Sequence, residues 1–169
     1  MATSDRKVIF SLTATAIILF SCIFSVKSFK LSQPNDTKSY TPHWEPLCGH
    51  QYLFSEEKVD WNAAREMCQL LGGYIVRIEN RHENNCILVY AQNNGLHYWW
   101  WTSGNDIETE GYYVMEDGTE MEWMQQYWNS VRGASKDAIL FGTQNNEYAG
   151  LWIDNSINVA ERYICEKDD

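Results

Sequence analysis

The segment DWNAAREMCQLLGG, residues 60–73, decides the fold, because it specifies one amphipathic helix together with both of its ends. Asp60 is a good N-cap residue, since its carboxylate can accept a hydrogen bond from a free N–H of the first turn. Gly72 and Gly73 end the pattern. Between these ends, apolar side chains recur at the three- and four-residue spacing of one helix face: Trp61, Ala64, Met67, Cys68 and Leu71. We therefore predict a helix over residues 61–71.

A short strand and a second helix follow directly. Residues 74–78, YIVRI, alternate as a strand does. Asn80 and Glu83 have the spacing of a capping box, which indicates that a helix starts there, and Asn94-Gly95 ends it. Its apolar face contains Cys86, Ile87 and Tyr90.

Further strands are predicted on both sides of the helices. Residues 52–54, YLF, precede them. After the second helix no helical period is visible, and turn residues separate five short strand candidates: 98–102, 111–115, 138–143, 148–154 and 162–166. Two helices followed by a run of short antiparallel strands predict the α+β fold class.

The N-terminal segment has the pattern of a targeting signal. Residues 8–26 contain no charged side chain, Arg6 and Lys7 precede them, and Val26-Lys27-Ser28 provides small residues at the offsets of a cleavage site. We therefore expect a signal peptide over residues 1–28 and a secreted protein. A run of this length also suits an uncleaved type II membrane anchor, and that alternative stays open.

A linker is expected between this leader and the folded domain. Residues 29–46 contain all three prolines of the chain and many small polar residues. Asn35-Asp36-Thr37 is a glycosylation sequon, so in an exported chain we expect Asn35 to carry a glycan. Residues 47–169 then form one domain.

The composition excludes several functional classes. Lys and Arg number 13 against 23 Asp and Glu, which gives a formal net charge of −10. Nucleic acids and anionic membrane surfaces both require a basic face, so we expect neither as a partner. The 14% of aromatic residues is too high for a disordered acidic tail. No G-x-S-x-G, Walker A or dinucleotide-binding motif occurs, so we expect no catalysis.

The cysteine count suits an oxidising compartment. One of the five cysteines, Cys22, lies in the leader and would be removed with it. The remaining four allow three different disulfide pairings, between which the residues alone do not choose: Cys48, Cys68, Cys86 and Cys165.

An ordered series of short motifs resembles a known family. The motifs are WNAAREMC at 61–68 with LGG at 71–73, IENRHENN at 78–85, WTSGND at 101–106, EG at 110–111, DGT at 117–119, WID at 152–154 and ICE at 164–166. Together they resemble the C-type lectin-like domain family over nearly all of residues 48–169. The resemblance implies two helices around a double-looped, mostly antiparallel sheet whose ends lie together.

The same resemblance implies a disulfide pattern. The framework bridge of the family corresponds to Cys68–Cys165, and this leaves Cys48 with Cys86. A second bridge near the long loop is common in the family but is missing here, because Ala138 and Ile157 occupy its two positions.

Calcium is the disfavoured cofactor. Family members that bind sugar through Ca²⁺ carry Glu-Pro-Asn or Gln-Pro-Asp in the long loop and a Trp-Asn-Asp motif, whose oxygen atoms complete the shell of a hard cation. This chain has no proline after Pro46, and its corresponding motif is Trp152-Ile153-Asp154. We therefore expect no metal or other cofactor.

An irregular stretch supplies the candidate ligand-binding residues. Residues 124–137 show no period, and loops of this length are often functional. An aromatic face can stack on a sugar ring or anchor a protein partner, and amide or guanidinium groups can hydrogen-bond to either. The alternative is that Trp128 only closes the loop onto the domain. With the last residue of the WID motif, the candidate set is Gln125, Tyr127, Trp128, Asn129, Arg132 and Asp154.

We expect a secreted recognition protein that binds carbohydrate without calcium, in innate defence or at a cell surface. The partner would be a glycan or a cell-surface protein, with membrane contact only if the leader is retained. The alternative is a protein-interaction module without sugar binding. Its acidic surface would contain Asp106, Glu108, Glu110, Glu116, Asp117, Glu120 and Glu122, between which no Lys or Arg occurs.

Overall fold

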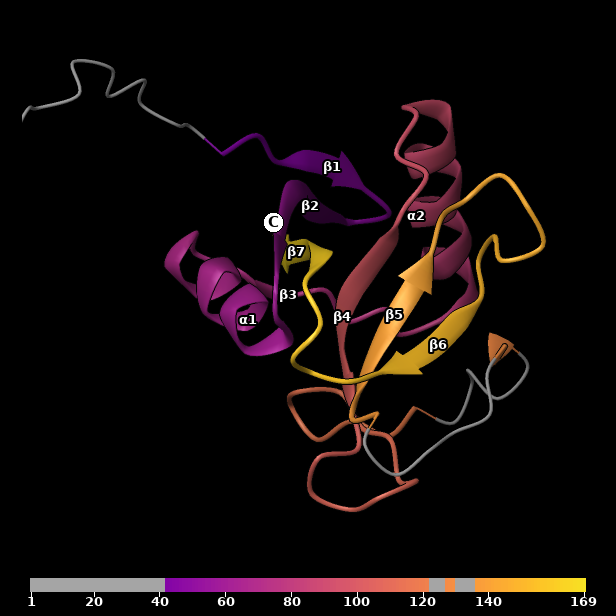
Figure 1. The fold of residues 1–169 in the computed structure, drawn as a ribbon. Helices are drawn as coiled ribbons and strands as arrows, with labels where there is room; N and C mark the ends of the chain where they lie inside the picture. Colours follow the sequence, from indigo (N-terminus) through magenta and orange to yellow (C-terminus); the bar gives the residue numbers. More distant parts are fainter. Residues whose placement is uncertain (1–41, 122–126, 130–135) are drawn as a thin grey trace, which may run out of the picture. The chain divides into compact units, whose positions relative to one another are not determined.

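The computed structural model describes residues 42–121, 127–129 and 136–169. Within these residues the chain forms two helices and seven strands (Figure 1). Their bounds are β1 Glu45–Leu47, β2 His50–Val59, α1 Trp61–Leu70, β3 Tyr74–Ile75, α2 Arg81–Asn93, β4 Trp99–Asn105, β5 Ala138–Gly142, β6 Trp152–Asn155 and β7 Glu161–Lys167. The expected leader at 1–28 and the Asn35 sequon lie outside the described residues. No helix in the described part of the chain has the length and apolar character that a membrane span requires.

Helix α1 begins where the sequence predicts and ends at Leu70, one residue before the predicted end. Asp60 is its N-cap, and the carboxylate accepts a hydrogen bond from the Ala63 N–H at 2.9 Å. Gly72 has φ +82°, a conformation that glycine adopts without strain. Gly73 must also be glycine for a different reason. A Cβ at that position would lie 2.3 Å from the Glu166 carbonyl oxygen of β7.

Helix α2 also begins at its predicted cap, although its capping box is modified. Asn80 Oδ1 accepts a hydrogen bond from the Glu83 N–H at 3.0 Å. The Glu83 carboxylate does not return this bond to Asn80. Instead it accepts from the Glu79 N–H at 2.8 Å and from the Tyr52 hydroxyl of β2 at 2.7 Å. The residue that the sequence identifies as a cap therefore also connects α2 to the sheet.

The sheet confirms the α+β class. Its strand order is β1-β2-β7-β4-β5-β6, and β3 pairs with β7 outside this path. β4 and β7 run parallel, whereas the other strand pairs are antiparallel. β1 begins at residue 45, two residues before the predicted domain boundary, and it pairs with the start of β2.

Four strand predictions are wrong in extent or in kind. β2 has ten residues where the sequence predicts three, and β3 has two where it predicts five. Residues 111–115 form no strand, and only Val114 makes isolated bridges. The reason is a tight turn, because Asp106 Oδ2 accepts from the Gly111 N–H at 2.7 Å and Gly111 has φ +80°. The strand predicted over 148–154 begins only at residue 152, after a turn that contains Gly150 at φ +75°.

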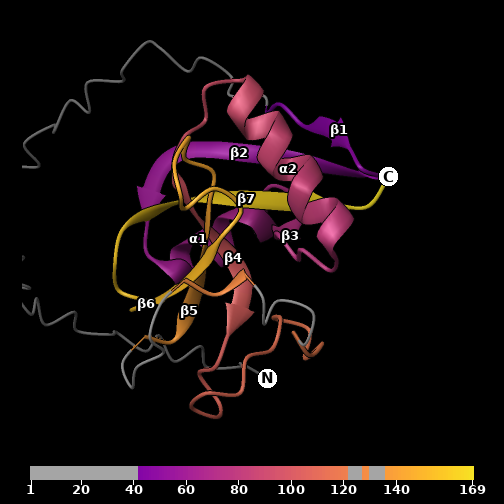
Figure 2. The ribbon, with the colours of Figure 1, turned by 90° about the vertical axis from the view of Figure 1, so that its right-hand side faces the viewer.

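The three consecutive tryptophans of β4 divide the core between the two sheet faces. Trp100 is fully buried in the cluster that includes Ile87 of α2. Trp101 is fully buried in the cluster that includes Ala64 of α1, against which Trp99 also packs. This is the alternation expected of a strand. The two helices therefore lie on opposite sides of the central strands, as Figures 1 and 2 show.

Two disulfides connect the helices to the sheet and its first hairpin. Cys68 of α1 is bonded to Cys165 of β7, and Cys48, in the turn between β1 and β2, is bonded to Cys86 of α2. These are the pairs that the family resemblance implies. The first of them closes a loop of 97 residues, which constrains the unfolded chain strongly.

Candidate functional site

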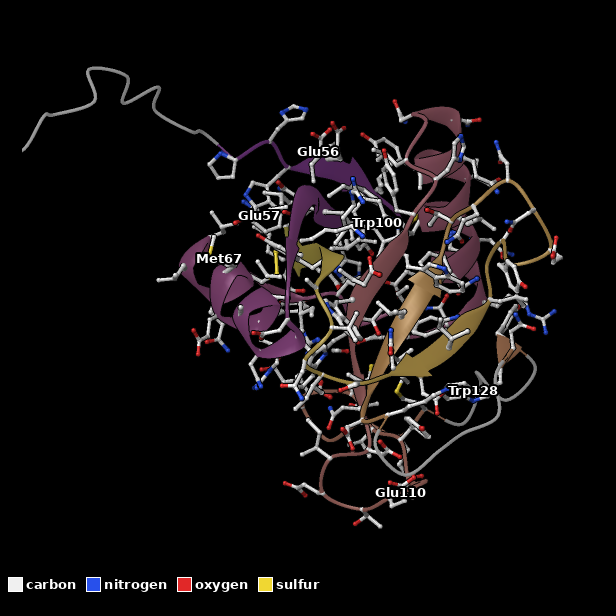
Figure 3. The ribbon with its side chains drawn as sticks, in the orientation of Figure 1. Glu56, Glu57, Met67, Trp100, Glu110 and Trp128 are labelled. Carbon is white, nitrogen blue, oxygen red and sulfur yellow. A yellow bond between two sulfur atoms is a disulfide. The ribbon has the colours of Figure 1, made fainter. Side chains whose placement is uncertain are left out.

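The described candidate residues gather at one end of the sheet. Trp128 makes a parallel bridge with Trp152 of β6, and the Asn129 N–H donates to the Trp152 carbonyl oxygen at 2.9 Å. Figure 3 places Trp128 and Glu110 at this end, away from Glu56 and Glu57. Gln125 and Arg132 lie outside the described residues. These backbone bonds attach residues 128 and 129 to β6.

The two loop aromatics pack on the domain. The Trp128 ring lies 4.8 Å from the Tyr113 ring, centroid to centroid, and both Tyr127 and Trp128 pack against the core cluster of Trp100. The Arg81 guanidinium lies 5.9 Å above the Tyr127 ring, at the outer limit of a cation–π contact. Both rings are half-buried, and Asn129 is exposed. Trp128 therefore packs on the body of the domain, and the faces of the two rings are only partly accessible to a ligand.

Asp154 is buried and cannot be a simple surface contact. Its side chain has no exposed area, and Tyr113 donates to its Oδ2 at 3.3 Å. The Lys136 ammonium lies 3.5 Å from its Oδ1, and the Lys136 side chain is 41% exposed. A buried carboxylate requires such compensation because desolvation penalises its charge. Asp154 thus pairs with the buried Tyr113 hydroxyl on one oxygen and with the partly exposed Lys136 on the other.

Further carboxylates surround this pair. Desolvation, together with the charges of Asp106, Asp137 and Asp154, raises the pKa of Glu110 above its ordinary value. Burial, followed by the charges of Asp106 and Asp154, also raises the pKa of the Tyr113 hydroxyl, so that it remains a neutral donor. Lys136 therefore lies in a strongly negative region.

The residues around Asp154 do not fit the calcium site of sugar-binding relatives. Calcium takes six to eight oxygen ligands. Ile153 offers no side-chain oxygen next to Asp154, and the ammonium of Lys136 is adjacent to the carboxylate. A divalent cation at this carboxylate would have to displace Lys136.

Two exposed aromatics were not identified from the sequence. Tyr112 is 50% exposed and its hydroxyl donates to the Glu120 carboxylate, whereas Tyr148 is 38% exposed with its ring 6.1 Å from that of Trp99. Both belong to segments predicted as strands. Strands at these positions would have turned some of their aromatic side chains toward the core. Tyr112 and Tyr148 are exposed because both lie in turns instead.

Much of the acidic run from residue 106 to residue 120 is neutralised within the molecule. Arg65 of α1 donates to the Glu116 carboxylate, with Nε at 2.8 Å, and Arg77 Nη1 lies 2.6 Å from Asp117 Oδ2. The hydrogen bond from the Thr119 N–H, and then the contact with Arg77, lower the pKa of Asp117. Asp106 is buried. The protein-interaction alternative requires a uniform acidic face. Since Glu116 and Asp117 are paired with arginines and Asp106 is buried, fewer carboxylates remain available for it.

Comparison with known proteins identifies similar sequences. The family profile described as "Lectin C-type domain" matches residues 57–167. The chain is 28% identical over 154 residues to "Lectin BRA-3" of Megabalanus rosa, which covers 89% of this chain and 88% of that protein. It is also 28% identical over 133 residues to "C-type lectin domain family 4 member M" of Nomascus concolor, covering 73% of this chain but only 30% of that longer protein.

Solved structures show the same fold. The mouse scavenger receptor C-type lectin carbohydrate-recognition domain superimposes with a TM-score of 0.64 at 25% identity, over 75% of this chain and 94% of that one. The herring type II antifreeze protein gives 0.60 at 19% identity, over 75% of this chain and 96% of that one. A fold shared with an antifreeze protein does not by itself identify a ligand.

Proposed function

The chain belongs to the C-type lectin domain family, and on this premise we propose that it is a secreted recognition protein that binds carbohydrate without calcium. In this proposal the protein recognises a glycan at a cell surface or in innate defence and catalyses no reaction. Export follows from the expected leader over residues 1–28, and the two disulfides suit the oxidising side of the membrane. "Lectin BRA-3", which matches most of the chain, is itself named a lectin.

The observation that carries calcium independence is the ion pair between Lys136 and Asp154. A fixed ammonium 3.5 Å from the buried carboxylate supplies the positive charge that a bound cation would otherwise supply. The ammonium has three N–H donors, and the Lys136 side chain is 41% exposed. Donors that Asp154 does not use can therefore hydrogen-bond to hydroxyl groups of a ligand. Lys136, absent from the sequence-based set, is therefore added to the proposed site.

The proposed contact surface combines this donor with the residues attached to β6. Asn129 offers an exposed amide with two donors and one acceptor oxygen. Tyr127 presents the accessible part of its ring, and Trp128 supports both through its packing on Tyr113. Gln125 and Arg132 flank these residues in the sequence and complete the proposed set.

A glycan array tests this proposal directly. The oxidised protein is applied with CaCl₂ and with EDTA, and we expect the same glycans to be bound in both conditions. Asn129→Ala should weaken binding by about 5- to 30-fold if it removes one or two hydrogen bonds. Asn93→Ala, an exposed asparagine at the end of α2, is the matched control and should leave binding unchanged.

Each other outcome has a defined meaning. Loss of binding in EDTA would refute calcium independence. Equal binding by Asn129→Ala and the control would exclude the proposed surface. The absence of any glycan ligand, combined with a protein ligand whose binding weakens at high salt, would favour the protein-interaction alternative, because screening reduces pairing between charges.

A further inference from the structure

Three metal-ligating side chains meet far from this site, where the C-terminal strand lies beside the first hairpin. In the β2–β7 ladder Tyr52 pairs with Glu166 and Gln51 with Lys167. One further step in this register brings His50 opposite Asp168. Residues two apart on a strand share a face, so Glu166 lies on the same face as Asp168. Figures 1 and 2 both show the C-terminus beside β1 and β2.

The ligand atoms of these side chains are close together. His50 Nδ1 lies 3.3 Å from Glu166 Oε1 and 3.5 Å from Asp168 Oδ1, and all three atoms are within 4.8 Å of one another. In the described part of the chain, no other group of three or more His, Cys, Asp or Glu side chains meets this condition. His50 Nδ1 is inaccessible to solvent and forms no hydrogen bond. Its ring nitrogen is thus near two carboxylate oxygens but aligned with neither.

Surrounding groups already hold the carboxylates in place. Glu166 is 3% exposed, and its second oxygen, Oε2, accepts from the Arg77 N–H at 2.9 Å, so that Oε1 is left facing His50. The Tyr74 hydroxyl contacts both Glu166 Oε1, at 3.2 Å, and Asp168 Oδ1, at 2.9 Å. Hydrogen bonds of this kind orient metal ligands and increase affinity.

We propose that His50, Glu166 and Asp168 form a binding site for a zinc-like divalent transition-metal ion. Zinc takes one imidazole nitrogen and carboxylate oxygens at about 2.0–2.2 Å, and in tetrahedral geometry such ligands lie about 3.3–3.5 Å from one another. Both distances from His50 Nδ1 agree with this value. The two carboxylate charges balance a divalent ion, and imidazole selects transition metals over Ca²⁺ and Mg²⁺.

One part of the proposed metal site is held by a disulfide, and another part is open to solvent. His50 follows two residues after Cys48, which its disulfide attaches to α2. The His50 and Asp168 side chains are 36% and 75% exposed, so an ion can enter from solvent and water can occupy a fourth position. A bound ion would tie the end of β7 to the start of β2 and thereby fasten the C-terminus to the domain.

The test uses zinc alone with the full, disulfide-bonded protein after treatment with EDTA and removal of the chelator. Isothermal titration calorimetry should show one Zn²⁺ per chain. With free Zn²⁺ at 100-fold above the dissociation constant, the Tm should rise by roughly 5–10 °C. Millimolar CaCl₂ should not displace the zinc.

Three variants identify the ligands. His50→Gln and Asp168→Asn should each weaken zinc binding by at least about 100-fold, because loss of a partner outside the coordination shell already costs about 10–100-fold. Asp168 is largely exposed, so Asp168→Asn should fold normally. This variant therefore tests the proposal even if His50→Gln is unstable. His43→Gln is the matched control, since His43 contacts a single carboxylate, that of Glu45, and should bind zinc as the unmodified protein does. No zinc binding by the unmodified protein, or full binding by Asp168→Asn, would overturn the proposal.

Discussion

The stability of the metal-free domain should fall between pH 4.5 and pH 8 because of one buried carboxyl group. Glu166 of β7 is 3% exposed and pairs with Tyr52 of β2 and Tyr74 of β3. Desolvation raises its pKa from 4.5 to about 7, and the charge of Glu83 acts in the same direction. The Arg77 N–H, His50 and the Tyr74 hydroxyl oppose this rise but do not cancel it. Glu83 faces Glu166 from α2, and burial raises its pKa as well.

The sign follows from the proton affinity of the two states. The folded protein holds the proton of Glu166 more tightly than the unfolded chain does, so the stabilisation is fully present below pH 4.5. It is lost as the pH rises to about 7. At about 1.4 kcal/mol for each pH unit, the difference between the two pKa values corresponds to on the order of 3 kcal/mol. This is a large share of the roughly 5–15 kcal/mol that stabilises an ordinary domain.

Urea denaturation in EDTA, at half-unit steps from pH 4.5 to pH 8, measures the effect. Glu166→Gln should remove most of the fall, since its amide does not titrate. Glu57→Gln removes an exposed carboxylate of β2 and is the control for net charge, so its pH profile should match that of the unmodified protein. Parallel profiles for Glu166→Gln and Glu57→Gln would falsify the assignment of the pH dependence to Glu166.

Three further changes should lower the free energy of unfolding by separate mechanisms, each measured by urea denaturation at pH 7. The double variant Cys68→Ser/Cys165→Ser opens a 97-residue loop and should cost about 4–5 kcal/mol; a loss below about 1 kcal/mol would contradict the loop-closure account. Asp60→Ala removes the bond to the Ala63 N–H and should cost about 1 kcal/mol, whereas Asp60→Asn, which keeps an acceptor, should be nearly neutral. Gly73→Ala drives a Cβ into a backbone carbonyl of β7 and should cost about 2–3 kcal/mol; unchanged stability would mean that β7 yields easily.

The helices could be predicted from the sequence because their signals are local. The Asp60 cap, the apolar spacing after it and the glycine pair specify α1 within 14 residues, and the structure places each as expected. The alternation of Trp99, Trp100 and Trp101 was predictable for the same reason. Each of these inferences requires only the period of a single element.

The strand lengths could not be predicted, because they depend on distant partners. β2 has ten residues since β7 supplies hydrogen-bonding partners along most of it, and β7 lies more than a hundred residues later. β3 stops after Ile75 because its pairing with β7 ends at Cys165. The failed strand at 111–115 has a different cause. There a side-chain acceptor, Asp106, captures a backbone N–H and produces a turn that the apolar alternation conceals.

In the candidate site, too, local features could be predicted from the sequence and contacts between distant residues could not. The expectation that no calcium binds here rests on residue types and on the missing proline tripeptide, both of which can be seen in the sequence alone. No sequence pattern marks Lys136, because its pairing with Asp154 depends on β5 and β6 being neighbours. A lysine next to one strand can neutralise a buried carboxylate on the neighbouring strand, and no local sequence motif reveals such a pair.

The histidine site near the termini extends this reasoning. His50 and Asp168 are separated by nearly the whole domain in sequence, and the register of two strands brings them together. In a fold whose ends meet, a ligand set can thus be divided between the first and last strands, where no local pattern reveals it.

The Asp154 region and the His50 region also differ in how they balance their charge. Lys136 provides the counter-charge for Asp154, whereas Glu166 and Asp168 share one imidazole between two carboxylates. The second region is therefore the one that a divalent cation would stabilise, and zinc should raise the Tm of the Lys136→Met variant as much as that of the unmodified protein.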